Sequence, residues 1–479
     1  MLYMRNFFMS NEKEPLSCFL FLPGEANLYL TLQSLHVILK SLLYSSAMRK
    51  KILLYHYTRL FTVSLFIGLV CAILAESLKR LTEHTEHFMY NWIEQTEPLL
   101  LFILPSVGIT IIYFLRKYLF KNRKNKGITE IYKTLDQRKD HLPLFKIPSH
   151  YINGFVTVIF GGSTGIEVST VVATATVGNA AYERGHTAFA YKKELVCAGV
   201  AAGVAVLFGS PLAGWLFAVE VIARKVSKTI LISCTAAALV AGLWVHFFDA
   251  VPLLPFAVNT WKLTSIPFYI ILGALGGLLA VYTTILVIRV KELFASIHNN
   301  FIRVNLGALM VGSMIYSLPY LFGDSYHGLK EVLNTVTTSS FDPSFLWIIL
   351  LLVILKPVAA SLTLGAGGDG GVFAPSIVAG SFLGILFAIC CNYLLGTQLV
   401  LLNFALVGAA ATLAAAIHAP LTALFLVCSL VPNGYHLFVP VLLGSYVGKL
   451  CAAKILPYNV YTYHLSAPKN EVPAITGQL

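Results

Sequence analysis

Charged residues are scarce in this chain. Only 12% of its 479 residues are Asp, Glu, Lys or Arg, whereas 57% are hydrophobic. Soluble globular chains carry about 25% charged residues, so this composition excludes an ordinary soluble protein. It predicts instead a polytopic membrane protein whose spans are embedded in the lipid bilayer.

Several motifs that carry catalysis or cofactor chemistry are also missing. The sequence has no His-Glu-x-x-His zinc motif and no Walker motif, so we expect neither zinc-dependent proteolysis nor ATP-driven transport. Its eight cysteines form no Cys-x-x-Cys pair and no zinc-ligand spacing. We therefore expect them to act as small buried hydrophobic side chains. An intramembrane enzyme using Glu167 with His418 or Asp369 lacks an evident nucleophile and is a distant alternative. We therefore expect a protein that is not an enzyme, with no cofactor and no bound metal.

The positive charge is confined to short loops. The formal net charge is +12, yet no basic, aromatic-interleaved region of the kind that binds nucleic acid exists. Residues 116–126 carry six lysines and arginines, and residues 49–51 and 224–228 carry smaller groups. By the positive-inside rule these loops are cytoplasmic, and we expect both termini on the same side.

The chain divides into one long membrane region with short flanking segments. Residues 1–54 lack a signal-peptide layout and are expected to form an N-terminal cytoplasmic segment. We expect residues 55–465 to form the membrane domain, with halves at 55–258 and 264–465, and residues 466–479 to be a short tail without C-terminal regulatory domains. The spans of about 20 apolar residues that are easiest to place are Thr58–Leu78, Leu99–Phe120 and the long Ile266–Phe294.

One carboxylate stands inside a glycine-rich interruption of the apolar sequence. The stretch Phe160-Gly-Gly-Ser-Thr-Gly-Ile-Glu-Val-Ser169 lets the backbone leave one helix and start another near Ile166, with Glu167 in its first turn. Unpaired N–H groups at such a start attract anions. Glu167 either stabilises its own helix dipole or serves a functional site, because acids at membrane depth are usually functional.

The chain also repeats itself. Gly199 to Gly214 aligns without a gap onto Gly408 to Ala423, and Gly161 to Ser169 aligns onto Gly367 to Pro375 with an offset of 206 residues, from Gly165 to Gly371. Two matches in the same order at nearly equal offsets indicate a duplicated half. Two helix starts, one from each half, are thus expected to converge on one anion, with Gly165, Ile166, Val372 and Phe373 around it. Such broken helices argue against a non-conducting scaffold.

At these residues the chain resembles the CLC family of chloride channels and proton/chloride exchangers. The resemblance is carried by Gly371-Val-Phe-Ala-Pro375, by Pro211-Leu-Ala-Gly-x-Leu-Phe-x-x-Glu220 and by the position of Glu167. It implies an all-α polytopic fold with two inverted halves, broken helices and re-entrant half-helices, assembled as a homodimer. It further implies a chloride pathway gated by Glu167 in each subunit, and we expect a bacterial inner-membrane location.

The resemblance assigns further positions and shows three departures. Tyr461 best matches the tyrosine that donates its hydroxyl to the anion, with Tyr458 and Tyr463 as competitors and an interfacial aromatic belt as the alternative. Lys126 replaces a family serine, and it either strengthens anion attraction or snorkels away from the pathway. The break also loses the family's basic residue, second glycine and proline around Glu167.

The third departure concerns proton coupling. Many exchangers of the family carry two adjacent glutamates where this chain reads Glu220-Val221, and a valine cannot relay a proton. Val221 is therefore the lost proton-relay position. This favours a passive voltage- or pH-gated chloride channel, with a proton-coupled chloride antiporter as the alternative in which Glu220 or a water chain substitutes.

Overall fold

The computed structural model describes residues 25–121, 123, 125, 127–136, 142–185, 191–248, 252–338 and 344–463. All of the regular elements within these residues are helices. The described residues up to Arg59 and those from Leu60 onward form two separate compact units. The second unit contains nearly all of the helices considered below.

The first half contributes helices of very different lengths. They are α2 (Glu25–Thr96), α3 (Leu100–Phe114) continued by the π-helical η1 (Leu115–Leu119), α4 (Ile128–Asp136), α5 (Lys146–Ile159), α6 (Glu167–Arg184), α7 (Lys192–Leu207), α8 (Pro211–Phe217) continued by η2 (Ala218–Ala223), and α9 (Lys228–Phe248). The expected span Leu99–Phe120 matches α3 and η1. The expected span Thr58–Leu78 lies inside α2, but its bounds are wrong because the helix continues beyond both ends. Polar residues after Leu78 end the apolar run, yet no Gly or Pro before Pro98 ends the helix.

The second half repeats this irregularity. Its elements are η3 (Leu263–Ser265), α10 (Ile266–Ala295), α11 (Asn300–Ser317), η4 (Pro319–Leu321), α12 (Tyr326–Thr338), α13 (Phe345–Ala366), α14 (Phe373–Leu395), α15 (Leu401–Ile417), α16 (Pro420–Ser429), η5 (Gly434–Leu437) and α17 (Phe438–Ile455). The long span expected at Ile266–Phe294 agrees with α10. Within the described residues, seven helices are long and apolar enough to cross a membrane, while α15, α16 and the helix Pro211–Ala223 are shorter.

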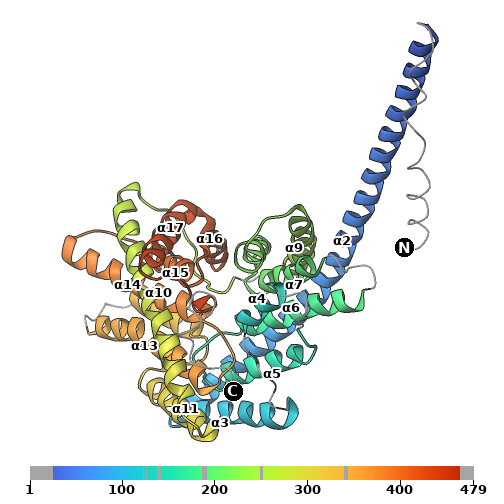
Figure 1. The fold of residues 1–479 in the computed structure, drawn as a ribbon. Coiled ribbons are helices and arrows are strands. Elements are labelled where there is room, and N and C mark those ends of the chain that lie inside the picture. Colours follow the sequence, from blue (N-terminus) through green and yellow to red (C-terminus); the bar gives the residue numbers. More distant parts are fainter. Residues whose placement is uncertain are drawn as a thin grey trace. The chain divides into compact units, whose positions relative to one another are not determined.

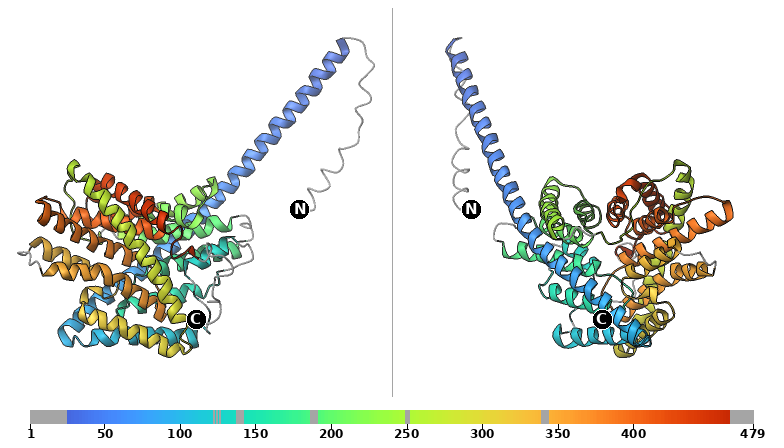
Figure 2. Two further views of the ribbon diagram at one scale, coloured as in Figure 1. Left: turned by 60° about the vertical axis from the view of Figure 1, so that its left-hand side comes forward. Right: turned by 180° about the vertical axis from the view of Figure 1, so that it is seen from behind.

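Helices of each half pack mainly with their own neighbours. Figure 1 shows α6, α7 and α9 together in green, and α15, α16 and α17 together in orange to red. The views in Figure 2 also show α3 of the first half beside α11 of the second half, so the two halves contact each other here. Small residues permit the closest approaches: a Cβ added to Gly408 of α15 would overlap the Gly380 carbonyl of α14. Such small-residue contacts are the usual means of packing helices in a membrane.

The two glycine-rich interruptions meet inside the second unit. We call residues 161–166, between α5 and α6, the first break, and residues 367–372, between α13 and α14, the second break. Gly165 and Gly371 form an isolated antiparallel bridge. The sequence alignment paired these same two residues, so the duplicated half predicted from the 206-residue offset is confirmed at the centre of the fold.

Candidate functional site

Two helix starts with the same backbone geometry follow the two breaks. Helix α6 starts at Glu167 with Ile166 as N-cap (φ −79°, ψ 0°), and α14 starts at Phe373 with Val372 as N-cap (φ −92°, ψ 4°). Neither N-cap supplies a side-chain hydrogen bond. The first-turn N–H groups of both helices are therefore available to an anion.

The carboxylate of Glu167 lies at these two helix starts. Its side chain is only 4% exposed, and its carboxylate interacts with its own backbone N–H and with that of Ala374 in α14. The carboxylate also rests against Gly165, where an added Cβ would overlap both of its oxygens. A glycine is thus required at position 165 for this side-chain position. The carboxylate occupies the place where a bound anion would gain most from the helix starts.

The hydroxyl of Tyr461 reaches the same point from the C-terminal end of the described chain. Its oxygen accepts a hydrogen bond from the backbone N–H of Val372 at 3.4 Å, and its ring lies 6.1 Å from that of Phe373. Asn459 fixes the backbone here, because its Oδ1 accepts from the Tyr461 N–H at 2.9 Å. Of the three candidate tyrosines, Tyr461 is the one that the structure places at a helix start.

A third helix start, that of α4, lies close to the other two. A Cβ added at Gly127 would lie 3.4 Å from the side chain of Val168, and the Thr129 hydroxyl donates to the Tyr461 carbonyl at 3.5 Å. Lys126, expected to contribute to anion binding, lies outside the described residues. The neighbouring Asn125 donates to the Ser149 hydroxyl at 2.8 Å.

The breaks are held by matching hydrogen bonds, each partner shifted by the same 206 residues. The Ser163 N–H of the first break donates to the Thr363 hydroxyl of α13 at 3.1 Å, and the Asp369 N–H of the second break donates to the Thr157 hydroxyl of α5 at 2.9 Å. Each break is therefore held by the helix that precedes the other break. We call the contacts of α13 with Ser163 the first clasp and the contacts of α5 with Asp369 the second clasp. This reciprocal arrangement links the two helix starts to each other through both halves.

Each clasp also carries a buried ionisable side chain that sequence reasoning did not place in the site. Lys356 of α13 donates to the Ser163 hydroxyl at 2.9 Å, and Nδ1 of His150 in α5 lies 2.9 Å from a carboxylate oxygen of Asp369. All of these side chains are buried. The 206-residue offset relates Lys356 to His150 and Asp369 to Ser163, so the two pairs occupy equivalent positions of the repeat. An alignment extended along α5 and α13 would show this equivalence without showing the contacts.

Val221 is buried in the π-helical turn η2 and is 5% exposed. Its carbonyl accepts a hydrogen bond from the Tyr132 hydroxyl at 3.2 Å. The carboxylate of neighbouring Glu220 accepts from the backbone N–H and the hydroxyl of Thr422, at 2.9 and 2.7 Å. Glu220 thus caps the start of α16 and links the two halves, while position 221 presents no titratable group. His418, named above only for the distant enzyme alternative, is the C-cap of α15 with φ +59°.

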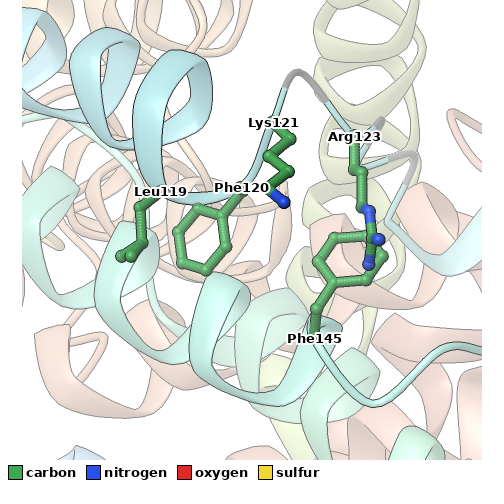
Figure 3. A pocket seen from close by; sticks show the side chains of 5 residues that line it. All are labelled: Leu119, Phe120, Lys121, Arg123 and Phe145. Atoms are coloured by element: carbon green, nitrogen blue, oxygen red, sulfur yellow. The ribbon is translucent and has the colours of Figure 1, made fainter.

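A small basic pocket lies where η1 ends. It has a volume of about 130 Å³ and is lined by Leu119, Phe120, Lys121, Arg123 and Phe145 (Figure 3). The Arg123 guanidinium lies 4.9 Å from the centre of the Phe145 ring. The adjacent Lys146 forms an ion pair with Glu130 of α4. Lys121 and Arg123 thus place two cations at this pocket, on the side expected to be cytoplasmic.

These features define an all-helical, internally duplicated membrane protein with paired broken helices. The profile of the family described as "Voltage gated chloride channel" matches residues 107–453. The chain belongs to this family. The predicted fold class, an all-α polytopic membrane protein with CLC-type inverted halves, broken helices and re-entrant half-helices, is confirmed.

The chain resembles curated bacterial members over most of its length. It is 27% identical over 409 residues to the H(+)/Cl(−) exchange transporter ClcA of Vibrio cholerae serotype O1, covering 82% of this chain and 85% of that protein. It is 26% identical over 358 residues to ClcA of Yersinia pestis bv. Antiqua, covering 72% of each.

Solved structures show the same fold. A CLC-type fluoride/proton antiporter superimposes with a TM-score of 0.71 and 22% identity, covering 85% of this chain and 98% of the other. A slow cyanobacterial Cl−/H+ antiporter superimposes with a TM-score of 0.72 and 21% identity, covering 86% of this chain and 99% of the other. The chain is accordingly an integral, multi-pass membrane protein of the CLC type.

Proposed function

We propose that this protein moves chloride across the membrane in exchange for protons, with Glu167 as the gate. One observation carries the proposal: the Glu167 carboxylate is buried between the starts of α6 and α14, where it competes with an anion for the same N–H groups. When it is deprotonated it blocks the site, and when it takes up a proton it loses its hold on the helix starts and leaves. Chloride then binds to the N–H groups near Val372 and Phe373 and to the Tyr461 hydroxyl.

Proton exchange is preferred to passive conduction because the similar curated proteins are named exchange transporters. The expectation of a passive channel, drawn from Val221, is the less well supported of the two. It remains the second candidate on a specific observation: position 221 is buried and apolar, and the neighbouring Glu220 is held by Thr422. A voltage-gated channel belongs to this second candidate only.

Purified protein in chloride-loaded liposomes separates the candidates. Chloride efflux and external pH are recorded together while valinomycin and potassium clamp the voltage. The exchange proposal expects chloride efflux that drives protons against their gradient at a fixed ratio. Chloride efflux without coupled protons supports the passive channel, and absence of any chloride flux contradicts both.

Assembly as a homodimer, an inner-membrane location and cytoplasmic termini belong to the same proposal. Apolar side chains exposed on α9 and α17 provide surface for a second copy, among them Leu243, Phe247 and Leu450. Subunit counting by single-molecule photobleaching in the membrane tests the dimer. A single bleaching step in most particles would contradict it.

A further inference from the structure

The gating acid Glu167 directly follows the first break, which has no cation of its own. Glu167 is flanked by Ile166 and Val168, both apolar, and the break residues 161–166 carry no basic side chain. Burying a carboxylate without a compensating charge is costly. A counter-charge supplied by another part of the fold would therefore change how readily Glu167 is protonated.

Lys356 is the cation that the fold brings to this break. It lies in the middle of α13, 0% exposed, and reaches Ser163, four residues before Glu167. Its Nζ donates to three oxygens: the Ser163 hydroxyl at 2.9 Å, the Ser325 hydroxyl at 2.7 Å and the Gly323 carbonyl at 3.2 Å. Lysine is rarely buried without partners, and here all three of its N–H groups are matched.

The hydrogen-bond directions fit the charged form of this lysine. The Ser163 hydroxyl donates to the Leu321 carbonyl at 2.9 Å, and the Ser325 hydroxyl donates to the Phe322 carbonyl at 3.3 Å. Both serine oxygens are thus left to accept from Lys356. Three acceptors around one nitrogen suit an ammonium, which has three N–H donors and no acceptor.

Three acidic side chains interact with this ammonium. Glu167 interacts electrostatically with Lys356, as do Asp324, which precedes α12, and Glu86 of α2. The Glu86 carboxylate in turn accepts from the Asp324 N–H at 3.2 Å. The other titratable or charged groups that face Glu167, Asp324 or Glu86 are Tyr326, Tyr461, Lys330 and Glu83. Lys356 is the cation that Glu167, Asp324 and Glu86 share.

We propose that Lys356 is a positioning residue for the gate: its ammonium, fixed on Ser163 and Ser325, favours the deprotonated Glu167 carboxylate at the helix starts and so sets the pH at which the gate opens. Asp324 and Glu86 also interact with the Lys356 ammonium and so weaken its effect on Glu167. The proposal rests on Glu167 being the gate. It adds a tuning group that is distant in sequence and makes no contact with the transported ion.

The sign of the effect follows from the charges. Removing the ammonium makes the deprotonated carboxylate less favourable, so Glu167 takes up a proton at a higher pH. Anion flux then persists to higher pH than in the wild-type protein. Removing the charge of Asp324 has the opposite effect. It eliminates a negative charge near Glu167 and one that competes for the Lys356 ammonium, so Glu167 keeps its deprotonated form to a lower pH.

The test measures chloride efflux from liposomes as a function of pH and reads the midpoint rather than the rate. Lys356→Met, which keeps the side-chain length without the charge, is expected to raise the midpoint by about one unit or more. Lys356→Arg retains the charge and is expected to stay close to the wild-type midpoint. In the Glu167→Gln protein, adding Lys356→Met is expected to change the pH profile no further.

The outcomes separate the two proposals. A Lys356→Met protein that is slower or less stable but has an unchanged midpoint would show a merely structural lysine and overturn the inference. If the single variant Glu167→Gln, in which Lys356 is unchanged, keeps the wild-type pH profile, the assignment of Glu167 as the gate fails instead. Should Lys356→Met not fold, the half-buried Asp324→Asn carries the test: a lower midpoint supports the inference, and an unchanged or higher midpoint contradicts it.

Discussion

The two breaks of this protein share one backbone and differ in a few side chains. Ile166 and Val372 have nearly the same φ and ψ, and each precedes a helix whose first residues offer free N–H groups. The first helical residue is Glu167 in one half and Phe373 in the other. In the function we propose, the duplicated backbone therefore provides anion affinity twice, while one carboxylate in one half provides the gate.

The clasps differ in the same way. The first break is held by a lysine on a serine, Lys356 on Ser163, and the second by a histidine on an aspartate, His150 on Asp369. The positive group at the first clasp has a gating acid nearby, whereas the acid at the second clasp already has its own partner. We infer that the first clasp tunes the gate and that the second clasp serves stability. The following predictions test this division, from the largest expected effect to the smallest.

Replacing the one acid that distinguishes the helix starts is expected to have the largest effect. Glu167→Gln cannot lose a proton, so chloride flux is expected to lose its pH dependence, whereas the wild-type flux is expected to change roughly tenfold per pH unit on the sloping part of its profile. Efflux from liposomes at a series of pH values measures this. Proton coupling should also disappear. A variant with the wild-type pH profile would place the gate elsewhere.

The glycine under the carboxylate is the next most sensitive point. A Cβ at Gly165 would overlap both Glu167 oxygens, so Gly165→Ala should displace the carboxylate and give flux at high pH close to that of Glu167→Gln. Gly371→Ala is the matched variant in the second half, where the Cβ overlaps Val168 and lies 3.1 Å from the Tyr461 hydroxyl, and does not meet the Glu167 carboxylate. Similar pH profiles for both variants would contradict the asymmetry between the breaks.

Breaking the second clasp should affect stability and leave gating unchanged. Asp369→Ala leaves buried His150 without its partner and is expected to cost about 1 to 3 kcal/mol of folding free energy. Thermal unfolding in detergent measures the loss, and Asp369→Asn should recover part of it by keeping a hydrogen bond. A shift of the pH midpoint for chloride flux in Asp369→Asn would show that this clasp tunes the gate too.

Removing the tyrosine hydroxyl should weaken anion binding. In Tyr461→Phe the helix start at Val372 loses one oxygen neighbour and a bound anion loses one donor, so affinity is expected to fall by about fivefold, corresponding to about 1 kcal/mol. Isothermal titration calorimetry with chloride measures it. Tyr458→Phe and Tyr463→Phe serve as controls and should bind normally.

Position 221 should be the least sensitive. Val221→Ala changes a buried apolar side chain that carries no proton, so the ratio of protons to chloride should be unchanged and the rate should stay within about twofold. The liposome assay reports both quantities. A changed ratio would show that the volume at position 221 controls a water path for protons.

Much of the site could be predicted from the sequence because glycine-rich interruptions are visible in an apolar chain. The break at Gly165, its equivalent at Gly371 and the helix starts after Ile166 and Val372 all lie where the sequence predicts them. Of the three neighbouring tyrosines, Tyr461 lies near the helix start at Val372, and its role in anion binding stays a prediction. The length of α2 was not predicted, because hydropathy marks the lipid-embedded part of a helix and does not mark its ends.

The sequence by itself determined a duplicated, all-helical membrane protein with a single acid at one of two equivalent helix starts. These features follow from composition, local backbone requirements and an offset along one chain. Only the tertiary structure decided which distant side chains face that acid. Lys356 and His150 each lie 11 residues, about three helical turns, before the break that follows them in the sequence, and nothing local marks them as partners of the opposite break. Burial and charge pairing depend on contacts between the halves, and such contacts are a property of the folded chain.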